Sequence, residues 1–446
     1  MKILLVHQNF PAQFLHLARR LAADGRHEVV FISEPNRNRI DGVRLVPYRR
    51  PPGSPAAIHP AARDLDAASR RAEAVARTAG ALKGLGFVPD VILGHHGWGE
   101  LLNLPDVWPN APLVGYFEFF YRVDGSDVGF DPEFPSASED FPRIRAKNAI
   151  NLLALQLGRH GQTPTTWQHS TYPDWARNDI QVLAEGADLD RCRPDPAARR
   201  KVLKIGTMAI APEDRLVTYV SRDLEPYRGV HVMMRALPKL LRAQPDLKVV
   251  MVGGDGVSYG APPPTGTWRQ HFLAELGDAV DPARVAFPGR VPYDTYLRLL
   301  QRSDVHVYLT YPFVASWSLR EALAVGCAVV GSDTPPVREF ITDGVNGRLA
   351  SFFDPAGLAA TVLELLDDRA QARRLRAGAR AFAEQHLDLA RTLDDYAGLV
   401  RRLTGGGEIF ASVPPTARAV AGATPGAAPI PHPAATKRTS RAATRR

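Results

Sequence analysis

Residues 303–355 read SDVHVYLTYPFVASWSLREALAVGCAVVGSDTPPVREFITDGVNGRLASFFDP and have the pattern of a strand, a tight loop, a helix, a second strand, a loop and a short third strand. Two runs in this stretch, 305–309 and 327–331, have the length of a strand and are apolar almost throughout. Such runs are typical of parallel strands that are covered on both faces. The stretch therefore predicts the centre of a parallel α/β sheet.

A helix is predicted between the two runs. Residues 316–325 place apolar side chains at helical spacing, and Gly326 is suited to the left-handed position that ends a helix. A helix that begins just past a buried parallel strand points its free N–H groups at the carboxyl edge of the sheet, where a phosphate group can bind. Glu321 lies in the predicted first turn, and Glu339 follows the next strand. The stretch thus combines a candidate phosphate site with two candidate carboxylates.

The segment 311–339, YPFVASWSLREALAVGCAVVGSDTPPVRE, resembles the nucleotide-sugar-binding segment of the family 4 glycosyltransferases, which are retaining enzymes of the GT-B architecture. Two glutamates eight positions apart mark that segment in the family. Glu321 matches the second, which in the family binds the ribose hydroxyls of the nucleotide. Phe313 stands in place of the first, which in the family lies near the transferred sugar. The chain therefore resembles a subgroup that lacks the first glutamate.

Length and composition favour a two-domain globular protein. The 446 residues are too many for one ordinary core, and 45% hydrophobic with 23% charged residues is typical of a soluble chain. Much of the net charge of +8 lies in the tail from Gly405, so the rest carries too little positive charge for a nucleic-acid groove. Cys192 and Cys327 lack metal-ligand spacing and favour a reduced, cytoplasmic compartment.

The N-terminal end begins as a βαβ unit. A strand is predicted at 2–7, an amphipathic helix at 14–25 and a second strand at 28–32. The first glycine of the chain is Gly25, so the glycine-rich turn of a dinucleotide site is absent after the first strand. This excludes a nicotinamide or flavin cofactor at this end. We expect no membrane span, because no apolar run approaches the roughly 18 residues that one needs, and no signal peptide, because the N-terminus enters a strand directly.

Polar residues crowd the ends of the next two predicted strands, 90–94 and 111–118. They are His95, His96, Trp98 and Glu100 after the first, and Glu118, Tyr121 and Arg122 at the second. The irregular run 124–143 follows, and loops of that length are usually functional or mobile. In the second half, strands are predicted at 215–222 and 248–256.

Together with the resemblance, these patterns predict an α/β chain of GT-B type, with two facing Rossmann-like doubly wound domains and a cleft between them. The first domain covers 1–194 and would hold the acceptor, and the second covers 195–385 and would hold the donor. A helix at 386–404 would return to the first domain by resemblance. The Ala/Pro-rich basic tail 405–446 has too few large apolar residues to order and is predicted to be disordered.

Arg222 and Arg228 in SRDLEPYRG match the family's arginine and lysine that bind the two phosphates of the donor. In GT-B enzymes no metal is normally required, so cationic side chains and helix N-termini neutralise the leaving diphosphate. The alternative is a pair of surface arginines. By resemblance, His95 contacts the donor sugar, and the predicted catalytic residues are Arg222, Arg228 and His95. The resemblance names no nucleophilic carboxylate, and the leaving phosphate would take the acceptor's proton.

Further residues are candidates on the donor side of the cleft. Glu321 either binds ribose or forms a capping box with Ser318. Glu339 either touches the nucleotide or sugar, or is a helix-dipole partner. Glycines at the end of the strand 248–256 either admit a ligand closely or form a plain turn. The predicted donor-binding set is Glu321, Glu339, Gly253, Gly254, Ser318 and Leu319.

The acceptor or sugar side belongs to the first domain. We expect His95, rather than the adjacent His96, to point into the cleft, the alternative being a histidine satisfied in the core. The loop after the first strand offers side-chain hydrogen bonds, although Asn9 is also suited to cap a helix. The D-x-D pattern at 188–190 is interpreted as a turn, and no metal site is predicted. Candidates on this side are His7, Gln8, Asn9, His96 and Glu118.

The sequence thus predicts a retaining glycosyltransferase that uses a UDP- or GDP-sugar, without a metal, and a saccharide, lipid or other hydroxyl acceptor. Two alternatives are a nucleotide-sugar epimerase of the same architecture and a non-catalytic nucleotide-sugar-binding relative. Basic residues in 2–50 are compatible with contact to an anionic membrane or with a solvated surface. No nucleic-acid partner is expected.

Overall fold

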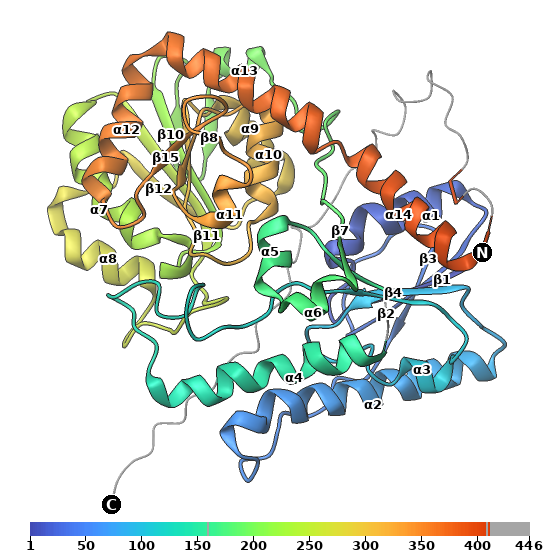
Figure 1. The fold of residues 1–446 in the computed structure, drawn as a ribbon. Coiled ribbons are helices and arrows are strands. Elements are labelled where there is room, and N and C mark those ends of the chain that lie inside the picture. Colours follow the sequence, from blue (N-terminus) through green and yellow to red (C-terminus); the bar gives the residue numbers. More distant parts are fainter. Residues whose placement is uncertain (158–159, 407–408, 411–446) are drawn as a thin grey trace, which may run out of the picture.

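Two parallel sheets organise the chain, which was analysed as a computed structural model describing residues 1–157, 160–406 and 409–410 (Figure 1). The first sheet has the order β3-β2-β1-β4-β5-β6-β7 and the second the order β12-β11-β10-β13-β14-β15. The predicted α/β fold with two doubly wound domains is confirmed. The tail predicted to be disordered lies, from residue 411 on, outside the described residues.

The first domain contains seven parallel strands. They are β1 Lys2–Val6, β2 Glu28–Ser33, β3 Val43–Pro47, β4 Val91–His95, β5 Leu113–Tyr116, β6 Gly161–Thr163 and β7 Ile180–Val182. The helices around them are α1 Leu15–Asp24, α2 Arg63–Gly84, α3 Leu104–Val107, α4 Phe141–Leu157, α5 Thr166–Thr171 and α6 Asp174–Arg177. Strand β1 pairs with both β2 and β4, so the strand order reverses at β1 and β4. In such sheets ligands bind outside the carboxyl ends at this point.

The second domain repeats this plan. Its strands are β10 Arg215–Asp223, β11 Leu247–Gly254, β12 Val285–Gly289, β13 Val305–Tyr308, β14 Val329–Ser332 and β15 Arg348–Ala350. Its helices are α7 Val230–Ala243, α8 Trp268–Leu276, α9 Tyr293–Arg302, α10 Trp317–Val325, α11 Pro335–Arg338, α12 Pro355–Asp367 and α13 Arg369–His386. A small antiparallel pair, β8 Leu203–Ile205 and β9 Met208–Ile210, precedes them. Here the strand order reverses between β10 and β13.

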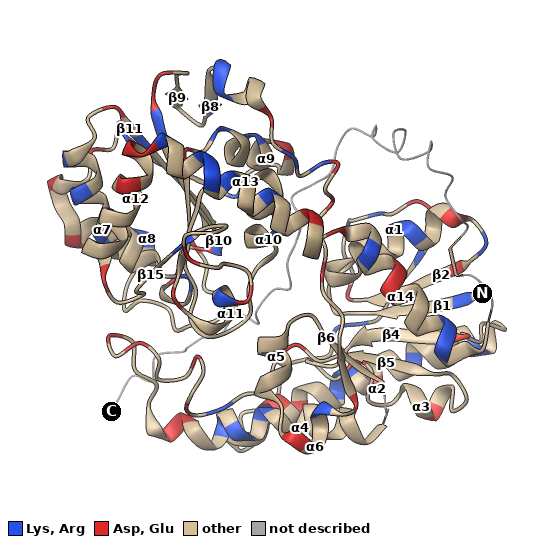
Figure 2. Ribbon diagram, turned by 45° about the horizontal axis from the view of Figure 1, so that its top comes forward, with Lys and Arg blue, Asp and Glu red and all other residues tan. Residues whose placement is uncertain are grey.

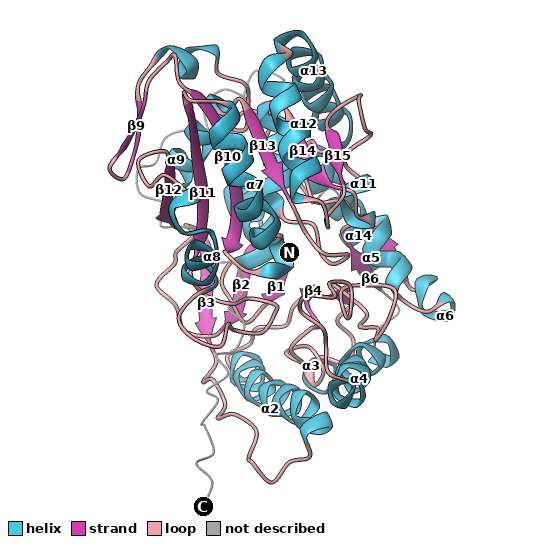
Figure 3. Cartoon of the chain, turned by 90° about the vertical axis from the view of Figure 1, so that its left-hand side faces the viewer, coloured by secondary structure: helices cyan, strands magenta, loops and turns pink. Residues whose placement is uncertain are grey.

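Helices cover both faces of the second sheet (Figure 3). One core joins side chains of α7, α8 and α12 to β10, β11 and β13. The core on the other face joins α9, α10 and α13 to β13 and β14. The strands are apolar on both sides because both faces are covered, as the unbroken apolar runs predict. Gly326 has a φ of 74° and ends α10 in the left-handed conformation.

The C-terminal helix α14, Leu389–Thr404, leaves the second domain and packs on the first (Figure 1). Its Tyr396, Ala397 and Val400 belong to the same apolar core as Ile3 of β1 and Leu17 of α1. A crossover of this kind ties the two domains together at the side where the chain passes between them. It also places residues near the end of the chain against the first strand.

The irregular run after β5 is anchored rather than free. Residues 124–137, which we call the interdomain strap, belong to the first domain but pack on the core of the second through Phe130 and Phe134. Asp131 accepts a hydrogen bond from Tyr311 Oη at 2.8 Å and pairs with His231 at 3.1 Å. The length of this run therefore reflects a structural connection across the domain boundary.

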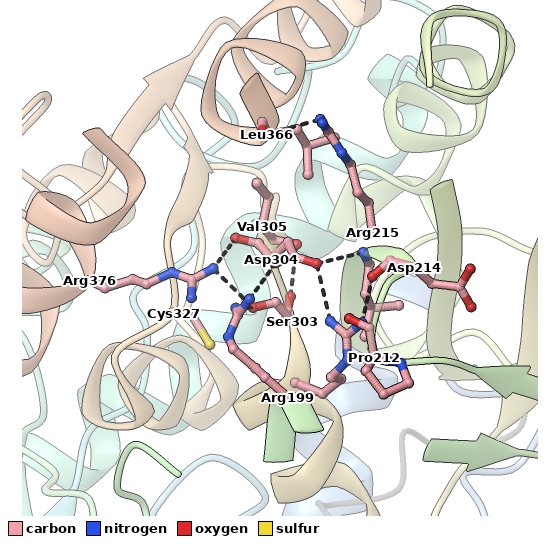
Figure 4. A network of polar contacts seen from close by, with 12 residues as sticks. Arg199, Pro212, Asp214, Arg215, Ser303, Asp304, Val305, Cys327, Leu366 and Arg376 are labelled. Carbon is pink, nitrogen blue, oxygen red and sulfur yellow. Dashed lines mark hydrogen bonds and ion pairs between the residues drawn. The ribbon is translucent and has the colours of Figure 1, made fainter. Parts of the chain in front are cut away.

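At the end of the second domain away from the carboxyl ends of its strands, Asp304 is the centre of a buried polar network (Figure 4). One carboxylate oxygen accepts a hydrogen bond from Arg199, and the other accepts from the Leu216 N–H at 2.8 Å and from Arg302 at 3.2 Å. Arg302 is 1% exposed. The network joins the residue just before β13 to β10 and so helps to fix the register of these two neighbouring strands.

Candidate functional site between the two domains

A cavity of about 220 Å³ lies between the carboxyl ends of the two sheets. The first domain contributes Gln13, Tyr116, Glu118 and Glu185 to its wall. The second contributes, among others, Arg222, Arg228, Tyr259, Arg290, Tyr293, Tyr296, Ser318 and Glu321. The structure therefore brings the two predicted arginines and Glu321 into one cavity, which both domains complete.

Strand β10 and the turn after it position the two arginines. Arg222 lies near the end of β10, and Arg228 closes a short 3-10 helix, Pro226–Arg228. Arg228 is 4% exposed and donates to Thr310 Oγ1 and to the Val314 carbonyl, both at 2.8 Å. Its guanidinium also lies 4.9 Å from the centre of the Tyr259 ring. These contacts fix a buried cation at the cavity wall, which is the charge that a diphosphate needs.

Glu321 is held by two tyrosines of α9. Tyr293 and Tyr296 donate their hydroxyls to its two carboxylate oxygens, each at 2.7 Å. Burial raises the pKa of Glu321, and the two tyrosine hydrogen bonds oppose that rise. The capping-box alternative is wrong, because α10 begins after Ser316 with no side-chain cap and has no acidic residue in its first turn. Glu321 thus lies one turn further along α10 than the sequence analysis placed it.

Glu339 lies outside the cavity wall. Its two carboxylate oxygens accept hydrogen bonds from the N–H groups of Thr166 at 2.7 Å and Trp167 at 2.9 Å, at the start of α5 in the first domain. The prediction that Glu339 binds the donor is not supported by this placement. Its carboxylate is used as a helix-dipole partner, but for a helix of the other domain.

Of the other predicted donor-binding residues, one lines the cavity and three do not. Ser318 lines the cavity, whereas Leu319 is fully buried in the core of the second domain. Gly253 and Gly254 end β11 outside the cavity wall. A Cβ at either position would crowd a neighbouring side chain, that of Leu224 or of Asp223. These two glycines are therefore explained by protein packing rather than by a close ligand.

His95 and His96, at the end of β4, contact different neighbours. His95 Nε2 lies 3.6 Å from Glu118 Oε2, and its ring stacks on Trp98 at 4.3 Å and on Tyr116 at 5.1 Å. His96 packs on Phe117 at 4.8 Å, and burial lowers the pKa of His96 to about 3. His96 is therefore a neutral core residue. His95 is 1% exposed and is not part of the cavity wall, but it contacts Tyr116 and Glu118, which line the cavity.

The loop after β1 places further polar groups beside His95, outside the cavity wall: the His7 ring is fully buried and lies 5.2 Å from the His95 ring. His7 Nδ1 accepts a hydrogen bond from the Asn9 N–H at 2.8 Å, and burial lowers the pKa of His7 well below its ordinary value. Gln8 Nε2 and Asn9 Nδ2 are buried without a hydrogen-bond partner in the described part of the chain. The helix-cap alternative for Asn9 is wrong, since the cap positions here are Pro11 and Phe14.

Several residues of the cavity wall were not predicted from the sequence, and Glu185 and Tyr259 are two of them. Glu185 accepts from Tyr116 Oη at 3.0 Å and from Trp317 Nε1 at 2.7 Å, so it joins the two domains at the cavity. Tyr259 is placed by Glu225, whose carboxylate accepts the N–H groups of residues 258–260. Neither residue follows a motif, because each depends on a partner that is distant in sequence or lies across a loop.

Within residues 1–157, 160–406 and 409–410, no cluster of three or more His, Cys, Asp or Glu side chains is arranged to hold a metal ion. Asp188 accepts the N–H groups of Asp190 at 3.2 Å and Arg191 at 3.0 Å, so the D-x-D pattern is a turn. The same part of the chain contains no helix that is both long and apolar enough to cross a membrane. Lys and Arg positions are interspersed with Asp and Glu over both domains in Figure 2.

Two facing parallel domains with a cleft between their strand ends define the GT-B class of α/β proteins. The family model "Glycosyl transferase family 4 group" matches residues 25–192, and "Glycosyl transferases group 1" matches residues 207–382. Together these two modules span most of the chain and leave only a short connection between them. The chain therefore belongs to the family 4, group 1 glycosyltransferases.

Curated relatives match part of the chain. D-inositol 3-phosphate glycosyltransferase of Nocardia farcinica is 32% identical over 211 residues, which are 46% of this chain and 44% of the relative. Phosphatidyl-myo-inositol mannosyltransferase of Mycolicibacterium smegmatis is 32% identical over 180 residues, 39% of this chain and 41% of the relative. The matched region thus spans less than half the length of these relatives.

Solved structures match over nearly the whole chain. Sucrose-phosphate synthase from Thermosynechococcus elongatus superposes with a TM-score of 0.69 at 17% identity, covering 91% of this chain and 100% of that one. HepE of Anabaena, solved in complex with UDP-glucose, superposes with a TM-score of 0.64 at 17% identity, covering 90% and 100%. At this level of identity the likeness is one of fold.

Proposed function

We propose that this protein is a retaining glycosyltransferase that moves a sugar from a UDP- or GDP-sugar to a hydroxyl group of an acceptor, without a metal. The observation that carries the proposal is the position of Arg222, Arg228 and Glu321 around one interdomain cavity. The family membership of the chain and the UDP-glucose complex of HepE support the donor class.

In this proposal the second domain binds the donor. Glu321 accepts hydrogen bonds from the ribose hydroxyls, and Arg222 and Arg228 bind the two phosphates. As the bond from the anomeric carbon to the phosphate oxygen breaks, negative charge grows on the diphosphate. Two guanidinium groups at the wall of one cavity, of which Arg228 is buried and held by hydrogen bonds, stabilise that charge more than water does. The leaving phosphate takes the proton of the acceptor hydroxyl, so transfer occurs on one face of the sugar.

The first domain would bind the acceptor beside His95 and the loop after β1. Buried polar atoms without partners, such as Gln8 Nε2 and Asn9 Nδ2, are suited to bind hydroxyl groups. Two relatives are named for inositol phosphate and phosphatidyl-inositol, which supports a saccharide, polyol or lipid acceptor. Contact of the basic first domain with an anionic membrane, and a cytoplasmic location, belong to the same proposal.

The activity is tested by incubating the protein with UDP-glucose, UDP-galactose, UDP-N-acetylglucosamine and GDP-mannose, with and without inositol phosphate and simple sugars. We expect release of UDP or GDP that increases with one acceptor and persists in the presence of EDTA. Formation of a different nucleotide sugar with no diphosphate release would identify an epimerase. Nucleotide binding with neither product would identify a non-catalytic relative.

Arg222→Ala tests the donor site itself. A charge-assisted hydrogen bond contributes about 1.5–3 kcal/mol, so the affinity for UDP or GDP should fall about 10- to 100-fold in calorimetry. Arg77→Ala removes an arginine on the exposed surface of α2, whose side chain is 71% exposed, and serves as the control. Unchanged nucleotide affinity in Arg222→Ala would refute the phosphate assignment.

A further inference from the structure

The cavity wall contains three carboxylates, Glu118 and Glu185 of the first domain and Glu321 of the second. Glu321 comes from α10 of the second domain and interacts electrostatically with Arg191 and Arg320, besides its two tyrosine partners. Glu118 comes from the loop after β5 of the first domain and interacts with His95, Arg222 and Arg228. Glu118 is therefore the carboxylate that faces the proposed phosphate-binding guanidiniums.

Glu118 differs from the other carboxylate that the first domain contributes. Glu185 is 13% exposed and has hydrogen bonds from Tyr116 and Trp317 on its two oxygens, so its role is to join the domains. The Glu118 side chain is 27% exposed, and its distance of 3.6 Å to His95 Nε2 exceeds an ordinary hydrogen bond. The carboxylate oxygens of Glu118, which lines the cavity, can therefore still accept hydrogen bonds from a ligand.

The protein fixes the position of Glu118 without using its carboxylate. Gln168 Nε2 donates to the Glu118 carbonyl at 2.7 Å, and the Gln168 side chain is itself bonded to Thr165. His95, beside the carboxylate, is stacked between Trp98 and Tyr116 and cannot turn without displacing them. A carboxylate on a fixed backbone, next to a fixed imidazole and open to a cavity, is preorganised for a ligand.

Electrostatics keep this carboxylate charged. Burial raises the pKa of Glu118, but its contact with His95 and the charges of Arg222 and Arg228 outweigh burial, and the pKa lies below its ordinary value. Glu118 is therefore ionised at neutral pH, and it can accept hydrogen bonds but donate none.

A donor with its ribose at Glu321 and its diphosphate at Arg222 and Arg228 extends beyond the arginines toward Glu118. We infer that Glu118 accepts a hydrogen bond from a hydroxyl of the transferred sugar and stabilises the positive charge that develops at its anomeric carbon. This inference rests on the proposed function. It assigns the sugar contact to a carboxylate of the first domain, so the donor site is complete only across the domain boundary.

Sugar transfer in this proposal needs no covalent bond between the sugar and Glu118. The bond from the anomeric carbon to the phosphate oxygen breaks, and its electron pair stays on the diphosphate. The acceptor oxygen forms the new bond to the same carbon, and its proton passes to the phosphate. A glycosyl transition state carries positive charge at the anomeric carbon, and the carboxylate opposes that charge while remaining ionised. His95 is then a positioning residue for Glu118.

The test compares wild type, Glu118→Gln and the surface control Glu73→Gln. Calorimetry measures the affinity of each for UDP, UDP-glucose, GDP and GDP-mannose. A second assay measures the release of UDP or GDP from the two nucleotide sugars. Glu118→Gln keeps the shape of the side chain and removes its charge. We expect its affinity for UDP or GDP alone to stay within about twofold of wild type. The ratio of the affinity for the nucleotide sugar to the affinity for UDP or GDP alone should fall about fivefold or more. The rate of UDP or GDP release should fall about 100-fold. Glu73→Gln should match wild type.

Three outcomes overturn the inference. Glu118→Gln with wild-type turnover shows that the charge at this position is not needed, while the proposed function stands. Equal loss of affinity for the diphosphate and the nucleotide sugar shows a role in folding or phosphate binding instead. Absence of any nucleotide binding in wild type removes the proposed function and the inference together.

Discussion

Asp304 shows how one side chain fixes the start of the central strand of the second domain. Its carboxylate binds Arg199, Arg302 and the N–H of Leu216 at once. Asp304→Ala leaves the buried Arg302 and the partly exposed Arg199 without their anion, so we expect the free energy of unfolding to fall by about 3 kcal/mol. Urea denaturation followed by circular dichroism measures this change. Asp333→Ala, at an exposed pair with Arg338, should cost less than about 1 kcal/mol.

The same residue predicts a pH dependence of stability. Burial raises the pKa of Asp304, but Arg199, the Leu216 N–H and Arg302 outweigh burial and hold the pKa below its ordinary value. A lowered pKa contributes stability that is fully present above the unfolded pKa of about 3.9 and is lost as the pH falls through the folded pKa. The stability gap between wild type and Asp304→Asn should therefore be constant near pH 7 and narrow below about pH 4. A gap that widens in acid would contradict this prediction.

Single residues were predictable where they belong to a stretch with a clear strand or helix pattern. Arg222 lies at the end of β10 and Glu321 lies within α10, which connects β13 to β14, and the fold brings both to the cavity wall. Tyr259 was not predictable, because it reaches the cavity through a loop held by Glu225. Glu339 was misplaced because its partners, residues 166 and 167, are in the other domain, and a contact across such a distance leaves no pattern in the sequence.

At the scale of elements, strand β5 leads directly to Glu118. The absence of a side chain at Gly115 in this strand is explained by packing. A Cβ at Gly115 would overlap the His96 ring, which packs below the strand. Gly115→Ala should therefore lower the free energy of unfolding by about 1–3 kcal/mol through overpacking. Gly80→Ala is the matched control, since it lies in α2 with open space around its Cβ and should stabilise by about 0.5–1 kcal/mol. Thermal or urea unfolding of both variants measures the difference.

The elements themselves were largely predictable from the sequence. The runs 305–309 and 327–331 correspond to β13 and β14 with small shifts at the ends, because buried parallel strands have few polar positions. The run 124–143 was predicted to be functional or mobile, and the structure shows that its first part is anchored on the second domain. Its first part is the interdomain strap, and its two aromatic side chains are too few to form a periodic signal that would reveal their burial.

At the scale of the whole molecule, the contacts around α5 join the two domains. Glu339 of the second domain caps α5 of the first, Trp167 Nε1 donates to the Phe313 carbonyl at 2.9 Å, and the Phe119 and Phe313 rings meet at 4.7 Å. Phe313 is 5% exposed and is not part of the cavity wall. The position that is a glutamate in the resembling family is thus used here for packing between the domains.

Glu339→Gln should weaken this junction without unfolding either domain. The loss of a charged cap costs about 1 kcal/mol, and the cost falls on the contact between domains because cap and helix belong to different ones. We expect faster amide hydrogen exchange at residues 166 and 167, a larger radius of gyration by small-angle scattering, and weaker binding of the nucleotide sugar. Glu364→Gln, which removes a surface charge paired with Arg348 in the second domain, should change none of these. If exchange increases instead throughout the second domain, the carboxylate stabilises that domain rather than the junction, and the interdomain role of Glu339 is wrong.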